Sequence, residues 1–306
     1  MAEPIFDLPP VSVIIPVYNG EASIGACLAH LQRQNYPGEK MEIIVIDDGS
    51  TDRTMDIIHR FGVKCIAATN KGPSNARNEG IQYASGQILV FIDADCLADE
   101  NLIIRHVLAH LHFEVTDPRI KVVGGGIEGE NKNFWSICDD FCSWYNNHPA
   151  LPGKEVSAHP TANISFSRQL ADEIKFDAEL RFAEDYAFCV AVLRKGYKIF
   201  FEPQAKVRHV NRFSYPSFMK HAKDWASSQY NLLDKGLIKL IYTRPLLIPI
   251  QFAIQILYKM SVIIYYAFKV NRFNVLICLP FILINKLYLN YFTLKYHRAF
   301  YKSHSL

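Results

Sequence analysis

The sequence carries little excess charge and has no basic stripe. Its formal net charge is +3 over 306 residues, and no run of lysine and arginine with interleaved aromatics occurs in the first 200 residues. Because nucleic-acid binding depends on clustered basic side chains, we expect no nucleic-acid partner. Internal repeats, low-complexity tracts and a Gly/Pro/Ser-rich linker are also missing. Since half of the residues are apolar, the chain should fold around a substantial core.

The seven cysteines form no CxxC pair and no regular framework. A structural zinc site needs more closely spaced ligands, so we interpret these residues as reduced thiols in a cytosolic compartment. The first ten residues, MAEPIFDLPP, have neither a basic n-region nor an apolar h-region, and they do not resemble a secretory signal. We therefore expect the folded part of the chain to stay in the cytoplasm.

Short β-branched runs alternate with helical patterns from Val11 to about Ile127. This alternation predicts an α/β fold in which helices flank a mostly parallel, Rossmann-like sheet. The expected strands are VSVIIP, EIIVID, KCIAA, ILVFID and KVVGGGI. One face of the first expected helix follows the i, i+3, i+4, i+7 pattern and should pack on the sheet: Ile24, Cys27, Leu28 and Leu31.

Polar residues follow three of the expected strands. In such sheets ligands bind beyond the carboxyl ends of the strands, so these residues should share one site. They are Tyr18 and Asn19, then Asp47 and Asp48, then Asp93 and Asp95. The segment Asp93-Ala94-Asp95 offers two carboxylates at i and i+2, which suits a hard divalent cation that neutralises a nucleoside diphosphate. A turn with solvated aspartates is the alternative interpretation.

Five motifs in this order resemble the family 2 glycosyltransferases with the GT-A fold, over roughly Pro10 to Tyr230. They are PVYN from Pro16, DDGSTD from Asp47, GPSNARN from Gly72, DAD from Asp93 and ED from Glu184. Each motif is weak alone, but together they are specific. The resemblance implies a metal-dependent, inverting enzyme that uses a nucleotide sugar, with a mixed sheet flanked by helices and a C-terminal hydrophobic helical extension.

The resemblance also implies a nucleotide-binding set. Tyr18 would stack on the base and Asp48 would accept a hydrogen bond from a ring N–H, a pairing that suits uracil better than guanine. Arg77 would reach the base or a phosphate, with a surface arginine as the alternative. The full expected set is Pro16, Tyr18, Asn19, Glu21, Asp48, Arg77 and Asp93. The expected cofactors are Mn²⁺ or Mg²⁺ and a UDP-sugar.

By the same resemblance Asp185 is the general base and Glu184 a supporting acid. Both open an amphipathic stretch whose buried face would be Phe188, Val192 and Leu193, so the acids lie near the positive end of a helix. A carboxylate placed there can accept the proton of an acceptor hydroxyl in a single displacement. Ordinary N-terminal helix charges are the alternative.

His209 is a candidate third metal ligand beside Asp93 and Asp95, and its imidazole suits manganese. A structural histidine is equally expected. Asn163, in the segment HPTANISFSR, is a candidate acceptor contact, and a structural amide is the alternative. No Gln-x-x-Arg-Trp motif of processive synthases follows the ED pair, which favours transfer of a single sugar.

Long apolar runs begin near Pro245, and we place the domain boundary between residues 235 and 236. Residues 246–268 and 273–294 are each long enough to cross a bilayer. However, Gln251, Gln255 and Lys259 form one polar stripe, and Lys286 and Asn290 form another. Polar stripes suit helices that lie in the membrane interface, and lysines, arginines and tyrosines suit anionic lipid. Two core helices are the alternative.

The sequence therefore predicts a glycosyltransferase at the cytoplasmic face of the cell membrane, with a glycan or lipid-linked acceptor. Two other functions stay open. In the first, the acceptor is a polyprenyl phosphate, which needs no strong base. In the second, the chain is a non-catalytic module that binds nucleotide sugars.

Overall fold

The computed structural model describes residues 8–237 and 248–304. Their contacts divide the chain into two compact units. The sheet unit comprises Met1–Glu128 and Leu151–Val210, and the helical unit comprises Gly129–Ala150 and Asn211–Leu306. This division differs from the sequence-based boundary at 235/236, because residues 129–150 and 211–235 group with the C-terminal helices. The first seven residues and part of the segment that begins at 246 lie outside the described residues.

In its described residues the sheet unit contains nine strands and seven helical segments. Its strands are β1 (Val11–Val17), β2 (Met41–Asp47), β3 (Lys64–Ala67), β4 (Ile88–Ile92), β5 (Cys96–Ala98), β6 (Ile120–Glu130), β7 (Lys154–Val156), β8 (Asn163–Ser167) and β9 (Lys198–Val210). Its helices are α1 (Ile24–Leu31), the 3-10 turn η1 (Gly38–Lys40), α2 (Thr54–His59), α3 (Pro73–Tyr83), α4 (Leu102–Thr116), α6 (Arg168–Glu173) and α7 (Glu184–Arg194).

The strands form one mixed sheet in the order β3-β2-β1-β4-β8-β6-β9-β5, with β7 paired to β9. The first four strands pair in parallel, as the sequence predicts. The second half differs from the expected mostly parallel sheet, because β8 runs antiparallel to both β4 and β6 and β5 runs antiparallel to β9. The antiparallel pairing places the end of β9 beside the residues that follow β4.

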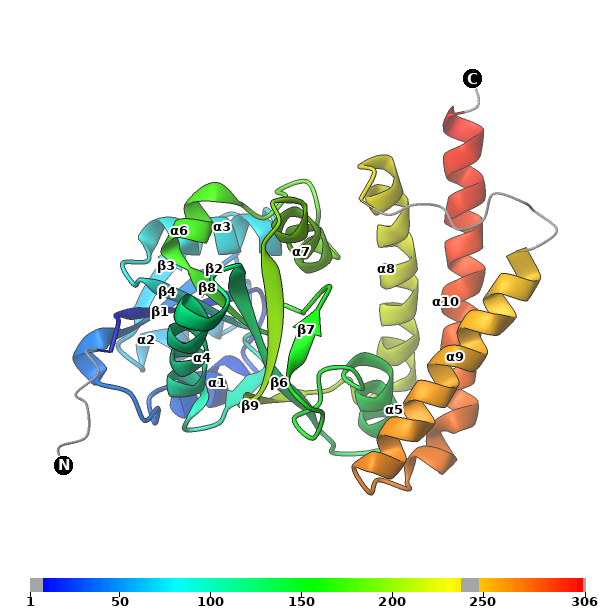
Figure 1. The fold of residues 1–306 in the computed structure, drawn as a ribbon, viewed down its shortest axis with the longest axis horizontal. Helices are drawn as coiled ribbons and strands as arrows, with labels where there is room; N and C mark the ends of the chain where they lie inside the picture. Colours follow the sequence, from blue (N-terminus) through cyan, green and yellow to red (C-terminus); the bar gives the residue numbers. More distant parts are fainter. Residues whose placement is uncertain (1–7, 238–247, 305–306) are drawn as a thin grey trace. The chain divides into compact units, whose positions relative to one another are not determined.

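Helices cover both faces of this sheet (Figure 1). On one face α3, α6 and α7 share a core with strand residues that include Phe91 and Phe166. The first helix buries the four residues that its spacing predicts, Ile24, Cys27, Leu28 and Leu31. In α7 the expected apolar face is correct for Phe188 and Val192 but wrong for Leu193, which is 37% exposed. Helices therefore cover both faces of the sheet, which leaves the ends of the strands as the place for polar side chains.

The helical unit consists of α5 (Phe134–Ser143), α8 (Tyr215–Asp234), α9 (Ile248–Lys269) and α10 (Val275–His304). The last helix extends ten residues beyond the expected end at residue 294. Two consecutive acids of α5, Asp139 and Asp140, are 1% exposed. Asp139 pairs with Arg212 at 3.1 Å, and Asp140 pairs with Arg272, which lies in the turn between α9 and α10, at 2.5 Å. These pairs join α5 to the segments before α8 and α10.

The polar stripe of α10 does not face solvent. Lys286 and Asn290 are each 8% exposed, and the Lys286 ammonium donates to the backbone oxygen of Cys142 in α5 at 3.4 Å. The sequence predicts a stripe that suits a helix in the membrane interface, but the stripe packs inside the helical unit and therefore gives no support to that placement. The side chains of Gln251 and Gln255 lie outside the described residues.

Candidate active site

The loops after β1 and β2 are tied together. Asn19, whose φ is +51°, accepts a hydrogen bond from the Thr51 amide at 2.8 Å, and its own amide donates to the Ser50 hydroxyl at 2.8 Å. A positive φ is tolerated by asparagine better than by most residues. Asn19 therefore shapes the loop that presents Tyr18, whose side chain is 50% exposed and open to a ligand.

Glu21 makes further contacts between the loops after β1 and β2. Its carboxylate accepts from the Arg53 amide and from the Arg53 side chain, both at 3.2 Å, and its amide donates to Asp52 at 3.1 Å. Pro16, in β1, is half-buried. Within the described residues, Glu21 and Asn19 thus make contacts that position the loops on which Tyr18 lies.

Asp48 lies at the end of β2 and lines a pocket of about 200 Å³ with residues of the β3–α3 loop and of α3. Its two carboxylate oxygens accept from the amides of Lys71 and Gly72 at 2.9 and 2.8 Å. Gly72 has a φ of +95°, which only glycine adopts without strain. Asp48 therefore fixes the loop that forms the pocket, and each oxygen keeps a further lone pair for a ligand.

Arg77 connects two acids from distant parts of the sequence. Its side chain is 4% exposed, and it pairs with Glu184 at 2.6 Å and with Asp93 at 3.0 Å. The Phe176 ring lies 5.7 Å from the guanidinium carbon. The structure thus places Arg77 between the loop after β4 and the first turn of α7, with both terminal nitrogens bonded to acids.

Asp185 is the second residue of α7, directly after Glu184, and is half-buried. Burial, followed by the charge of Glu184, raises the pKa of Asp185 to about 7, while the Tyr186 amide and Arg77 oppose the shift. Ala183, which precedes the first residue of α7, has a left-handed conformation with φ +61°. Such strain in a residue with a β-carbon costs about 1–3 kcal/mol and is concentrated at functional sites. Asp185 can therefore alternate between proton acceptor and acid near neutral pH.

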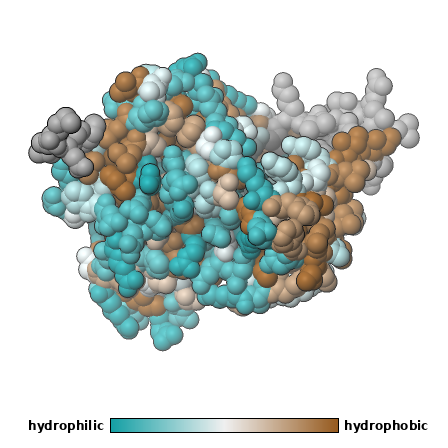
Figure 2. Space-filling view, turned by 60° about the horizontal axis from the view of Figure 1, so that its bottom comes forward, coloured by the Kyte–Doolittle hydropathy of each residue, from teal (hydrophilic) through white to brown (hydrophobic). Residues whose placement is uncertain are grey.

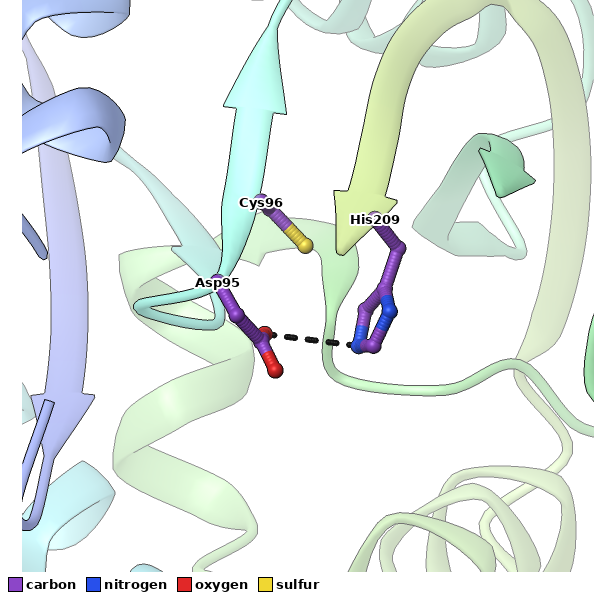
Figure 3. Close-up of side chains that lie close together, drawn as sticks. All are labelled: Asp95, Cys96 and His209. Atoms are coloured by element: carbon purple, nitrogen blue, oxygen red, sulfur yellow. Dashed lines mark ion pairs between the residues drawn. The ribbon is translucent and has the colours of Figure 1, made fainter. Parts of the chain in front are cut away.

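Asp95 and His209 face one another across the β5–β9 pairing (Figure 3). The His209 Nε2 atom lies 3.3 Å from a carboxylate oxygen of Asp95. Together with Cys96 they form a group whose ligand atoms lie within 4.8 Å of one another. Burial and the nearby charges of Asp95 and Asp93 raise the pKa of the Cys96 thiol well above its usual value, and the thiol lies 3.5 Å from the backbone oxygen of Ala162, to which it donates. A carboxylate and an imidazole suit Mn²⁺ better than a thiol does, so the ligands that suit this cation are Asp95 and His209.

Asn163 is a structural amide. It is fully buried, donates to the backbone oxygens of Gly126 and Ala205 at 3.0 and 2.8 Å, and accepts from His106 at 2.8 Å. All of its polar atoms are used within the protein, so the structural alternative holds and no acceptor contact remains to it.

Two family models match the chain. The glycosyl transferase family 2 model covers residues 12–151, and the glycosyl transferase family group 2 model covers residues 88–293, about two thirds of the chain. The chain belongs to the family 2 glycosyltransferases. It is therefore an enzyme of sugar transfer, and its mixed sheet with flanking helices is the GT-A fold.

The sequence is 24% identical over 253 residues, 77% of each chain, to a dolichyl N-acetyl-α-D-glucosaminyl phosphate 3-β-D-2,3-diacetamido-2,3-dideoxy-β-D-glucuronosyltransferase of Methanococcus voltae. The fold is similar to that of a Pyrobaculum calidifontis mannosyltransferase in complex with GDP-Man and Mn²⁺, with a TM-score of 0.60 and 19% identity over 94% of this chain and 87% of that chain. It is also similar to GalNAc-T7 with UDP, GalNAc and Mn²⁺, with a TM-score of 0.54 and 18% identity over 74% and 51% of the two chains.

The structure brings together three groups of the expected residues. Asn19 and Glu21 contact the loop after β2, Asp93 meets Glu184 through Arg77, and Asp95 meets His209. The sequence does not indicate the Arg77 bridge or the contacts of Glu21 with Arg53, because partners separated by 16 to 107 positions meet only after the sheet has formed.

Proposed function

We propose that this glycosyltransferase moves a single sugar, with inversion, from a nucleoside diphosphate sugar to a hydroxyl of a glycan or lipid-linked acceptor at the cytoplasmic face of the membrane. The observation that carries the proposal is Asp185, a half-buried acid with a pKa near 7 in the first turn of α7. A base is needed for a hydroxyl acceptor but not for a phosphate, and this favours the hydroxyl over a polyprenyl phosphate.

In the proposed reaction the acceptor oxygen attacks the anomeric carbon as its proton passes to the Asp185 carboxylate. The bond between that carbon and the diphosphate breaks, and the electron pair leaves with the nucleoside diphosphate. Glu184, held by Arg77, supports the base from the adjacent position. The acceptor and the diphosphate lie on opposite faces of the sugar, so the configuration inverts.

Asp95 and His209 would hold a divalent cation, because they supply an oxygen and a nitrogen ligand at close range. When bound there, such a cation supplies positive charge against the diphosphate. Two structures with this fold are complexes with Mn²⁺, which supports the assignment. Asp93, bonded to Arg77, is proposed to contact the cation or the ribose with its remaining lone pairs.

The nucleotide is proposed to bind at Tyr18 and Asp48, with uridine as the base. The exposed ring of Tyr18 and the pocket beside Asp48 support this part of the proposal. Of the two structural relatives, one holds GDP-mannose and the other UDP. Uridine and guanosine donors should therefore be compared directly.

The testing experiment incubates the detergent-purified chain and Mn²⁺ with UDP-sugars and GDP-sugars, with and without EDTA, and measures nucleoside diphosphate release. The glycan acceptor and a polyprenyl phosphate are then added in parallel. The proposal expects one donor to be used, loss of release with EDTA, and product from a hydroxyl acceptor that requires Asp185. Product from polyprenyl phosphate that survives Asp185→Asn would refute the hydroxyl acceptor. Nucleotide-sugar binding without release, even with acceptors, would refute catalysis.

A further inference from the structure

In the helical unit many large apolar side chains are exposed, whereas several polar side chains are buried. Thirteen of the twenty large hydrophobic side chains that are exposed among the described residues lie between Ile250 and Tyr291. On α9 and in the following turn they are Ile250, Ile254, Leu257, Tyr258, Tyr265, Phe268 and Phe273; on α10 they are Leu276, Ile277, Leu283, Ile284, Leu287 and Tyr291. We call these thirteen side chains the outer face. Figure 2 shows hydrophobic side chains concentrated over this part of the chain.

Three polar residues in the middle of α10 are buried. Asn285, Lys286 and Asn290 are 4 to 8% exposed. Asn285 donates to the backbone oxygen of Phe218 in α8 at 3.1 Å, and Lys286 donates to α5. A helix in water shows the reverse pattern, with its apolar stripe inside. An apolar patch of this extent on a monomer marks a surface that something apolar covers.

The helix that packs against the buried side of α10 restricts how a bilayer could cover the outer face. Helix α8 packs along α10 within the helical unit (Figure 1), and it exposes Lys220, Lys223 and Asp234 along its length. Charged side chains at the centre of a bilayer are costly. Because α8 would have to enter the bilayer beside α10, this packing argues against helices that cross the membrane, although residues 275–296 are long and apolar enough to do so.

The distribution of charge along the chain indicates that lipid covers the outer face. Residues 235–306 contain ten lysines and arginines and no aspartate or glutamate, whereas residues 1–234 contain twenty-three basic and thirty acidic residues. Lys269, at the end of α9, and Lys295, in α10 beyond the outer face, are exposed. Basic side chains at the margins of an apolar face with exposed tyrosines suit anionic headgroups above acyl chains. A second copy of this chain would bring two such basic segments together.

We propose that the outer face of α9 and α10 lies flat on an anionic bilayer, with its side chains inserted among the acyl chains and Lys269 and Lys295 at the headgroups. The helices bind one leaflet and do not span the membrane. This inference deepens the membrane association included in the proposed function and does not depend on sugar transfer. In this arrangement the polar residues of α10 do not face the headgroups, because Asn285 and Lys286 contact α8 and α5.

The first test is flotation of the full chain with vesicles of phosphatidylcholine alone or with phosphatidylglycerol. The double variant Ile277→Asn/Ile284→Asn should lower the partition coefficient at least about ten-fold, since each lost apolar side chain removes on the order of 1–2 kcal/mol of burial. Its matched control is Leu108→Asn/Val115→Asn, which changes exposed apolar residues of α4 and should leave partitioning unchanged. The double variant Lys269→Gln/Lys295→Gln should weaken binding to vesicles that contain phosphatidylglycerol but not to vesicles of phosphatidylcholine alone. Its control, Lys175→Gln, should not weaken binding to either.

The second test measures how deeply α9 and α10 insert into the bilayer. Single cysteines at positions 254, 268, 277 and 291 carry an environment-sensitive dye, and acyl chains brominated at shallow or deep positions quench it. Equal, shallow quenching at all four positions supports the flat arrangement. Deep quenching that changes steadily along each helix would show a spanning hairpin and overturn it. Absence of flotation, or a concentration-dependent dimer that Ile277→Asn/Ile284→Asn dissociates, would show that lipid is not the occupant. Neither result depends on whether the chain transfers sugar.

Discussion

In the sheet unit three acids share one buried arginine, whereas in the helical unit each of two buried acids has an arginine of its own. Arg77 faces Asp93, Glu184 and Asp185, so negative charge is left uncompensated. Asp139 and Asp140 are matched by Arg212 and Arg272. Excess charge that is partly open to solvent can bind a cation or a proton. Charge that is fully matched fixes the position of helices, and this difference separates a reactive site from a structural one.

The largest effect is expected from Asp185→Asn, because the amide cannot accept the proton of the acceptor. We expect kcat to fall about 10³-fold, within the usual range for a lost general base, with nucleotide affinity unchanged by calorimetry. Asp172→Asn, at an exposed position of α6, is the control and should have full activity. Equal kcat in the two variants would remove Asp185 from the mechanism.

Asp140→Asn tests the structural half of the comparison. It leaves the Arg272 guanidinium partly buried without its counter-ion, which should cost about 3–5 kcal/mol of unfolding free energy. Thermal or denaturant unfolding in detergent measures the loss, and Asp172→Asn again serves as the control. A stable Asp140→Asn variant would mean that the pair is not needed to position α5.

Asp95→Ala and His209→Ala should each weaken Mn²⁺ binding and reduce diphosphate release on the order of 10²-fold or more, because the cation is worth several kcal/mol to such a reaction. The matched variant is Cys96→Ala, which removes the third member of the group. Since that thiol donates to the backbone oxygen of Ala162 and is a poorer ligand for Mn²⁺ than a carboxylate or an imidazole, its loss should leave the dependence on Mn²⁺ unchanged. A metal titration followed by activity separates these outcomes.

Arg77→Lys keeps the charge but replaces the two guanidinium nitrogens that bond Glu184 and Asp93 by one ammonium, which cannot reproduce both contacts in the same geometry. We expect kcat to fall about 10- to 100-fold through misplacement of Glu184 and its neighbour, while the affinity for nucleoside diphosphate changes little. A loss of nucleotide affinity that accounts for the whole effect would show that Arg77 contacts the base or a phosphate, as the sequence alone suggests. Calorimetry and steady-state kinetics on the same preparation decide between the two roles.

The smallest expected effect is on pH dependence. Because the base acts deprotonated and the pKa of Asp185 is raised to about 7, kcat/KM should rise with pH through that region and level off above it. Glu184→Gln removes a charge that raises this pKa, so the rise should move to lower pH. A rise that stays in place would mean that another group titrates.

The parallel half of the sheet, the buried face of the first helix and the family could all be predicted from the sequence. Those features depend on local β-branched runs, on residues three and four positions apart, and on short motifs. The error at Leu193 has a related cause, because the periodicity gives the width of an apolar stripe only approximately. Asn163 was ambiguous for a different reason, since an amide in a strand looks the same in the sequence whether it binds a ligand or two backbone oxygens and a histidine.

The sequence by itself determined which chemical groups are available: carboxylates at strand ends, a histidine near the end of β9, and a basic, apolar C-terminal segment. Only the tertiary structure decided their partners. Arg77 meets Glu184 across 107 positions, and the polar stripe of α10 meets α5 across 144 positions. Local sequence encodes backbone conformation through nearest neighbours, whereas burial and pairing of charge depend on which distant segments the sheet and the helices bring into contact.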